Sequence, residues 1–147
     1  DCQLPETAVV LCCFNSSYKL TPAMFEVWMR IQRASRDSVL WLAGRHPMVQ
    51  QQLSAVAARS GVDPGRLIFA PIVPIDQHLA RQPLADLFLD SFPYNAHATA
   101  SIALRMGVPL VTLSGPSMLS RVAGSLLRSV GLPELITRSF AEYEALA

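Results

Sequence analysis

The sequence has little of several features that mark other classes of protein. Its longest uninterrupted apolar run, Ala8 to Phe14, has seven residues, far short of the roughly 20 that cross a bilayer as a helix. Charged residues make up only 16% of the 147 residues, and 12 basic side chains are almost cancelled by 11 acidic ones. We therefore expect no membrane span. We also expect that nucleic acid is not the main partner, because nucleic-acid-binding proteins usually carry a strong excess of basic residues.

Cysteine and histidine are also scarce. The three cysteines are Cys2, Cys12 and Cys13, and the adjacent pair would point to opposite faces of a strand. With three histidines and no C-x-x-C, no zinc ligand set has recognisable spacing. We expect buried free thiols in a reducing, cytoplasmic setting, no disulfide framework and no metal. No signal peptide is visible, and the abrupt start before a strand leads us to expect a piece of a longer protein.

What the sequence does have is an alternation of short apolar runs with segments of helical period, which is the order of a parallel sheet covered by helices. The predicted fold class is α/β, with a Rossmann-like parallel sheet and helices on both faces. The predicted strands are Ala8 to Phe14, Val39 to Leu42, Leu67 to Ala70, Leu87 to Leu89 and Leu110 to Leu113.

Capping residues, prolines and glycines place the helices. Thr21 and Pro22 predict a capped start for a helix whose Phe25, Trp28 and Ile31 face the sheet. A second helix begins at Pro47 and ends before Gly61, which suits a left-handed C-cap. Further helices are predicted over Ala98 to Met106, over Met118 to Val130, and after Ser139, which has capping-box spacing to Glu142.

Ligands of open α/β sheets bind beyond the carboxyl ends of the strands, so the turns that follow the strands carry the functional prediction. The turn after the first strand, Asn15 to Lys19, is polar and ends in the one lysine of the sequence. This lysine could meet a phosphate. The alternative is a solvated surface lysine, because most lysines are exposed.

The turn after the third strand contains two prolines, and His78 and Arg81 follow it at a spacing that puts both on one face of a helix. An imidazole can stack on a flat base, and a guanidinium can pair with a phosphate. A structural histidine beside a solvated arginine explains the pair equally well.

The turn after the fourth strand runs through small side chains into a helix start at His97, Ala98 and Thr99. Unpaired N–H groups at a helix N-terminus form an anion site, to which the Thr99 hydroxyl and the His97 ring could add donors. We expect a diphosphate to fit there. The sequence contains no G-x-G-x-x-G, G-x-x-x-x-G-K-[ST] or G-x-S-x-G motif, so dinucleotide oxidoreduction and P-loop phosphoryl transfer lack their usual support.

Five blocks in one order carry a resemblance to a known family over nearly the whole chain. They are Phe14-Asn15-x-x-Tyr18-Lys19-x-Thr21-Pro22, Ser38-Val39-Leu40-Trp41-Leu42, His78-x-x-Arg81-x-x-Leu84-Ala85-Asp86, Tyr94-Asn95-Ala96-His97-x-Thr99 and Ser120-Arg121-Val122-Ala123. Together they resemble the O-linked N-acetylglucosamine transferase and SPINDLY-type family. The resemblance implies that residues 1–147 are the C-terminal, nucleotide-sugar-binding half of a GT-B glycosyltransferase, with tetratricopeptide repeats and the other catalytic half upstream.

The resemblance also implies roles for individual residues. Lys19 is similar to the family lysine that neutralises the leaving diphosphate, a charge that the reaction needs. Ser16 stands at a donor-binding position of the same turn. The base would contact His78, the backbone of Val73 and Pro74, and the helix that carries Arg81. The diphosphate would lie on His97, Thr99 and the backbone at Ala98.

The sequence departs from the family at four polar positions. Family members commonly have glutamine at Ser16, lysine at Ile75, threonine at Ala98 and aspartate at Ile102. The lysine and the aspartate are family contacts to the ribose. A hydroxyl left against an apolar side chain costs about 1 to 3 kcal/mol, so we expect weaker nucleotide binding or another donor.

Three functions remain open from the sequence. The first is the donor-binding half of an inverting transferase that moves N-acetylglucosamine from its uridine diphosphate form to Ser or Thr hydroxyls of proteins, without a metal or other cofactor. The second keeps this fold but uses another nucleotide sugar, such as GDP-fucose. The third is a non-catalytic interaction module. In the first two, the acceptor protein would bind mainly through the half that this chain lacks.

Overall fold

The computed structural model describes residues 2–44 and 46–147. Six parallel strands form the sheet in the order β3-β2-β1-β4-β5-β6. The strands are β1 (Val9–Cys13), β2 (Ser38–Ala43), β3 (Leu67–Ala70), β4 (Leu87–Leu89), β5 (Leu110–Leu113) and β6 (Ile136–Thr137). The predicted α/β class is confirmed, and β6 is a strand that the sequence analysis missed.

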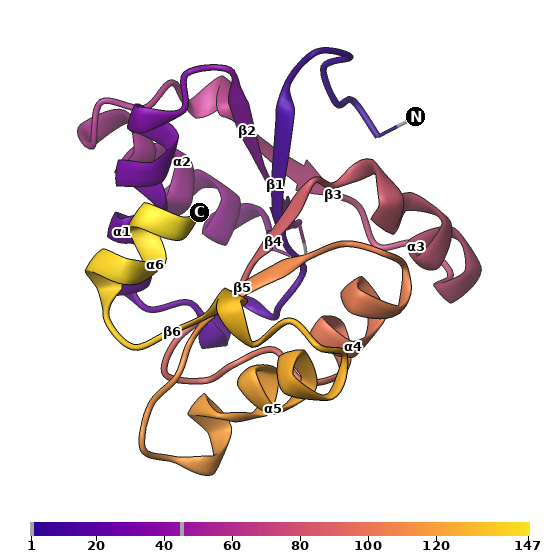
Figure 1. Cartoon of the computed structure of the whole chain (residues 1–147). Coiled ribbons are helices and arrows are strands. Elements are labelled where there is room, and N and C mark those ends of the chain that lie inside the picture. Colours follow the sequence, from indigo (N-terminus) through magenta and orange to yellow (C-terminus); the bar gives the residue numbers. More distant parts are fainter. Residues whose placement is uncertain (1, 45) are drawn as a thin grey trace.

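Helices cover both faces of the sheet (Figure 1). On one face lie α1, α2 and α6, and on the other lie α3, α4 and α5. The chain builds outward from β1 to β3, returns beside β1 and then builds toward β6, so the winding reverses between β1 and β4. The helices are α1 (Pro22–Ala34), α2 (Pro47–Arg59), α3 (Ile75–Arg81), α4 (Ala98–Arg105), α5 (Val122–Ser129) and α6 (Phe140–Leu146).

The predicted helix signals act as expected at most boundaries. The Thr21 hydroxyl caps α1 by accepting from the Met24 N–H, and Phe25, Trp28 and Ile31 are all buried. Gly61, Gly107 and Gly131 follow their helices with φ between 74° and 82°, a backbone region that costs glycine no steric penalty. Similarly, the Ser139 hydroxyl accepts from the Glu142 N–H at the start of α6.

The helix predicted over residues 118 to 130 is wrong as one element. A 3-10 turn, Met118–Ser120, comes first, and α5 begins only at Val122. Arg121 separates the two with φ −124°. The break has a local cause, because the Ser117 hydroxyl accepts from the Ser120 N–H and the Ser120 carbonyl accepts from the N–H of Gly115. This folds residues 114–120 back on themselves.

The core lies between the sheet and its helices, with Trp28, Trp41 and Phe88 among its largest fully buried side chains. All three cysteines are free thiols. Cys12 and Cys13 are buried as predicted, whereas Cys2 is only partly buried. Burial raises the pKa of the Cys13 thiol to about 12, so this thiol stays protonated and unreactive at neutral pH. No helix within the described residues is long and apolar enough to span a membrane.

Candidate functional site

The point where the winding reverses joins the turn after β1 to the turn after β4. Asn15 follows β1 and is buried, and its Nδ2 donates to the Ser91 hydroxyl at 2.7 Å. Its Oδ1 accepts from the Thr99 hydroxyl in the first turn of α4. Open α/β sheets bind ligands at this reversal. Asn15 therefore fixes the relative position of three elements where a ligand is expected.

Lys19 ends a 3-10 turn, Ser17–Lys19, at this same edge. Its Nζ donates to the backbone carbonyl of Asn95 at 3.2 Å and lies 3.9 Å from the centre of the Tyr94 ring. Partial burial lowers the pKa of Lys19, and the charge of Asp90 opposes that shift. The predicted cation thus lies against the turn after β4, 76 residues away in the chain.

The β4–α4 turn, defined here as residues 90–97, leads into α4. His97 occupies the position before the helix with φ −108° and makes no side-chain cap. Its ring is partly buried against Tyr94, 5.3 Å between ring centres. Within residues 2–44 and 46–147, its Nε2 is buried and has no hydrogen-bond partner. An unpaired buried ring nitrogen beside a helix N-terminus suits an additional polar ligand.

Ala98 and Thr99 form the first turn of α4. Ala98 is exposed and Thr99 is partly buried. The sequence analysis expected the Thr99 hydroxyl as a donor to phosphate, but its proton is engaged by Asn15. The hydroxyl would have to leave Asn15 before it could donate to a ligand.

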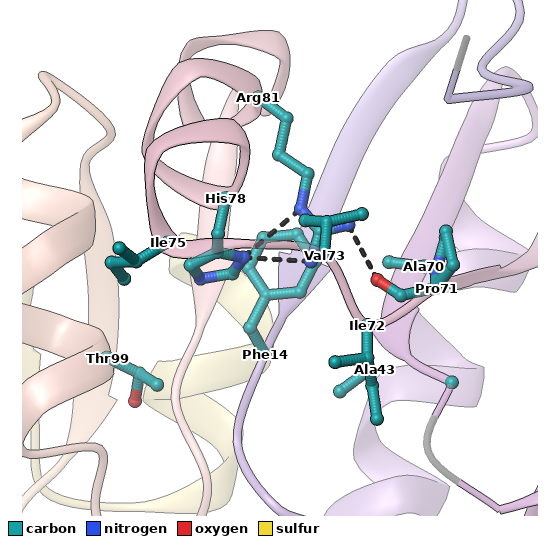
Figure 2. A pocket seen from close by; sticks show the side chains of 11 residues that line it. Phe14, Ala43, Ala70, Pro71, Ile72, Val73, Ile75, His78, Arg81 and Thr99 are labelled. Carbon is teal, nitrogen blue, oxygen red and sulfur yellow. Dashed lines mark hydrogen bonds between the residues drawn. The ribbon is translucent and has the colours of Figure 1, made fainter.

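A cavity of about 210 Å³ lies beyond the ends of β1, β2 and β3. Whole small ligands need about 300 to 1,000 Å³, so this space suits part of a ligand, such as a nucleobase. We call it the α3 cavity (Figure 2). Its lining residues are Phe14, Ala43, Gly44, Ala70, Pro71, Ile72, Val73, Ile75, His78, Arg81 and Thr99.

His78 and Arg81 form one hydrogen-bonded unit in the α3 cavity. Arg81 Nε and Nη2 lie 3.1 Å and 2.8 Å from His78 Nδ1, and Arg81 Nη1 donates to the Pro71 carbonyl at 2.9 Å (Figure 2). The Gln82 amide lies 2.9 Å from His78 Nε2. Burial lowers the pKa of Arg81, whose guanidinium lies 5.2 Å from the centre of the Phe14 ring.

The structure groups the predicted site residues in two places. Val73, His78, Arg81 and Thr99 line the α3 cavity, and Lys19 lies on the β4–α4 turn that ends at His97. Ser16 and Pro74 are not among the residues lining that cavity. Ser16 borders a neighbouring recess with Cys13 and Asn15. The carbonyl of Pro74 closes the first turn of α3 by accepting from the His78 N–H.

Sequence reasoning missed two kinds of residue. Ile75, which the sequence analysis named only as a departure from the family pattern, lines the α3 cavity and is 64% exposed. Ile102, the other such isoleucine, is partly buried and does not line this cavity. Asn15 and Asp90 were given no role, although both are buried polar residues that directly follow apolar strands. Their position could have indicated a structural role, because polar groups that are buried at the end of a strand require hydrogen-bond partners.

A metal site also finds no support in side-chain clusters. No group of three or more His, Cys, Asp or Glu side chains within the described part of the chain could hold a metal ion.

Fold and site together define a doubly wound α/β domain with a lysine and a helix N-terminus at its reversal point and a small cavity beside them. Comparison with known families agrees with this class. The chain belongs to glycosyl transferase family 41, whose family model matches residues 1–147.

Named relatives cover nearly all of this chain. It is 35% identical over 145 residues to the UDP-N-acetylglucosamine–peptide N-acetylglucosaminyltransferase of Caenorhabditis elegans, covering 99% of this chain and 13% of that protein. A probable UDP-N-acetylglucosamine–peptide N-acetylglucosaminyltransferase SPINDLY of Petunia hybrida is 35% identical, covering 91% of this chain and 15% of that protein. This chain therefore spans about one seventh of the length of these relatives.

A solved structure gives the same assignment. A lysine-to-methionine mutant of the O-GlcNAc transferase of Thermobaculum terrenum matches with a TM-score of 0.89 and 32% identity, over 99% of this chain and 30% of that one. The predicted family resemblance is confirmed, as is the Rossmann-like fold typical of half of a GT-B glycosyltransferase.

Proposed function

We propose that this chain is the donor-binding part of an inverting protein O-glycosyltransferase that transfers N-acetylglucosamine from UDP-N-acetylglucosamine to Ser or Thr hydroxyls of proteins. Family membership and the names of the relatives support this reaction class. Because the chain spans only 13% of the worm relative, the whole reaction belongs to a longer protein. In our proposal that protein is cytoplasmic and carries tetratricopeptide repeats and a second catalytic half.

The observation that carries the proposal is the placement of Lys19 against the β4–α4 turn, next to the start of α4. A diphosphate bound there would meet an ammonium group and the unpaired N–H groups of a helix N-terminus. His97 Nε2, buried and without a partner among the described residues, supplies a further polar contact. The lysine cation and the helix dipole would both act on the diphosphate, which gains negative charge when its bond to the sugar breaks.

The reaction assigns this chain a leaving-group role. The acceptor hydroxyl oxygen forms a bond to C1 of the sugar, and the bond from C1 to the diphosphate oxygen breaks with its electron pair, releasing UDP. Lys19 stabilises the charge that develops on that oxygen. The hydroxyl proton passes to a base, which we place in the catalytic half that this chain lacks. No metal is needed in this scheme, because Lys19 and α4 neutralise the diphosphate.

The α3 cavity is the proposed site for the uracil base. A flat ring would lie near the His78 imidazole and Val73, which both line the cavity; the backbone of Pro74, which the family resemblance also implies, follows Val73 just outside that lining. The Arg81 guanidinium holds His78 through Nδ1 and leaves the Nε2 side of the ring toward Gln82. Thus Arg81 acts by fixing the ring rather than as a free cation.

A second donor is a candidate because of Ile75. This side chain is exposed at the α3 cavity, where the family resemblance leads us to expect lysine. An apolar side chain cannot hydrogen-bond a ribose hydroxyl. Because this position departs from the family pattern, another nucleotide sugar, such as GDP-fucose, is the alternative donor.

Thermal unfolding of the full-length protein with excess UDP, and separately with GDP, tests the proposal. A ligand that binds the folded state raises the melting temperature. We expect UDP to raise it by several degrees, and we expect Lys19→Met to remove most of that shift, because a charged hydrogen bond is worth about 1.5 to 3 kcal/mol. Methionine keeps the apolar stem against Tyr94.

The matched control is Arg105→Met, which removes a positive charge at the opposite end of α4. It should leave the shift with UDP unchanged. A larger shift with GDP would favour the second donor. No shift with either nucleotide would contradict the proposal and favour a non-catalytic interaction module.

A further inference from the structure

Asp90 is a fully buried carboxylate that directly follows β4 and begins the β4–α4 turn. Its Oδ1 accepts from the N–H groups of Ser91 and Ala96, at 2.8 Å and 2.6 Å. Its Oδ2 accepts from the Thr112 hydroxyl on β5 at 2.6 Å. One side chain therefore closes the turn from both ends and ties it to the neighbouring strand.

The rest of the turn depends on the same anchor. Asn95 is buried, and its Nδ2 donates to the Ser91 carbonyl at 2.9 Å. Its N–H donates to the Leu119 carbonyl at 2.9 Å. The Asn95 carbonyl, which faces the other way, holds Lys19. The Asn95 carbonyl and the Ala96 N–H belong to the same peptide unit. The hydrogen bond from Ala96 to Asp90 therefore also fixes the position of the carbonyl that accepts from Lys19.

Asp90 is buried without a close countercharge. No lysine, arginine or histidine nitrogen of residues 2–44 and 46–147 lies within ion-pair distance of its carboxylate. The titratable groups that face it are Lys19 from the turn after β1, Cys13 from β1 and Tyr143 from α6. Tyr143 donates its hydroxyl to the Asp90 carbonyl at 2.9 Å. Burial raises the pKa of Asp90 to about 7.

We propose that Asp90 is a positioning residue for the donor diphosphate: its carboxylate holds the β4–α4 turn in the conformation that presents Lys19 and the start of α4. This inference rests on the proposed function. Asp90 is buried beneath the ligand site, and it acts through the peptide unit between Asn95 and Ala96. Its ionisation adds a negative charge beneath the diphosphate, so the same residue makes donor binding depend on pH.

The test compares Asp90→Ala and Asp90→Asn in the full-length protein, with UDP-N-acetylglucosamine as the ligand in calorimetric titrations from pH 6 to pH 8.5. Both phosphates of this ligand are substituted twice, by one ester and one anhydride bond each, so they lack the ionisation near pH 6 that phosphate monoesters show. We expect wild-type affinity to fall several-fold as the pH rises. Asparagine, which keeps two acceptor contacts, should bind nearly as well as wild type at pH 6 with a flatter profile.

Asp90→Ala should lose affinity about tenfold or more at every pH, the scale of a lost charged hydrogen bond. Amide hydrogen exchange without ligand gives an independent readout: Ala96 should exchange much faster in Asp90→Ala than in Asp90→Asn. If Asp90→Ala folds, binds as wild type and keeps Ala96 protected, the proposal is wrong. A pH profile of Asp90→Asn parallel to wild type also overturns it.

Should the wild type not bind UDP-N-acetylglucosamine at all, the proposed function fails, and amide exchange still decides the positioning role. Unchanged protection of Ala96 in Asp90→Ala would then reject it. If Asp90→Ala fails to fold, the comparison of Asp90→Asn with wild type decides instead, through its pH profile.

Discussion

The β4–α4 turn and the α3 cavity lie at the same edge of the sheet but are held by different means. The turn is fixed from below by buried groups, with Asp90, Ser91 and Asn95 all nearly inaccessible to solvent. The α3 cavity is walled by a short helix whose first residue, Ile75, is 64% exposed, and by Ile72 at 73%. Buried hydrogen-bond networks resist movement, whereas exposed walls can exchange side chains at little cost.

This difference suggests how specificity and chemistry are divided. In the proposed function, every donor of the class carries a diphosphate, and the rigid turn would bind that shared part. The base varies between donors, and it would lie on the exposed cavity wall. Substitutions at the turn should therefore alter stability and catalysis together, while substitutions at the cavity should alter ligand choice with the fold unchanged.

The largest expected effect concerns pH and the turn. The folded pKa of Asp90 is raised to about 7 from an ordinary 3.8, so between these values the folded chain binds more protons than the unfolded one. Stability should therefore fall as the pH rises from about 4 to about 7, by no more than roughly 4 kcal/mol. Urea unfolding at several pH values measures this, and Asp90→Asn should flatten the curve. Parallel curves would mean that Asp90 is not the titrating group.

The next effect tests how tightly the turn is supported from β5. A Cβ on Gly115 would lie 2.7 Å from Ser120 Oγ and 2.9 Å from Phe92 Cε2. Gly115→Ala should therefore destabilise the fold by about 1 to 3 kcal/mol, the usual cost of overpacking. Gly124→Ala in α5 is the matched control, because its nearest neighbour is Ile136 Cγ2 at 3.6 Å.

Gly124→Ala should be neutral or slightly stabilising, since alanine favours a helix over glycine. Urea unfolding midpoints of the two variants provide the comparison. Equal stabilities would show that the segment after β5 moves freely and does not brace the turn.

The five longer strands were predictable because strands buried on both faces are continuously apolar. Their observed bounds differ from the predicted ones by no more than one residue at either end. The two-residue β6 is too short to form a pattern, and it depends on pairing with Thr112 and Leu113. No proline or glycine marks the break at Arg121 in the sequence. The break results from the hydrogen bonds that Ser117 and Gly115 make with Ser120, and these form only in the folded chain.

The candidate site was predictable where a general rule of topology applies. Lys19 and Asn95 are 76 residues apart, yet both follow strands whose carboxyl ends share one edge. The role of Asp90 was not predictable, because only the folded chain adds Thr112 of β5 and Tyr143 of α6 to its local partners Ser91 and Ala96. For the same reason, the sequence did not reveal that Asn15 engages the Thr99 hydroxyl.

A smaller effect is expected at the cavity from Arg81→Met. The change removes the bonds to His78 Nδ1 and the Pro71 carbonyl, but both groups can reach water at this partly exposed site. We expect a stability loss of about 1 kcal/mol and a several-fold loss of UDP affinity, as the His78 ring is no longer fixed. Arg128→Met, in the last turn of α5, is the control. A loss as large as that of Lys19→Met would contradict the division between turn and cavity.

The smallest effect on the fold should come from Ile75→Lys, which tests whether the cavity wall contacts the ribose. Because Ile75 is 64% exposed, stability should change by no more than about 0.5 kcal/mol. The new ammonium group would lie at the α3 cavity and could hydrogen-bond a ribose hydroxyl, so UDP affinity should rise a few-fold. Leu84→Lys, at a 51% exposed position outside the cavity lining, adds the same charge nearby. If both variants gain equally in calorimetric titration, general attraction explains the effect; a gain in Ile75→Lys alone assigns ribose binding to the cavity wall.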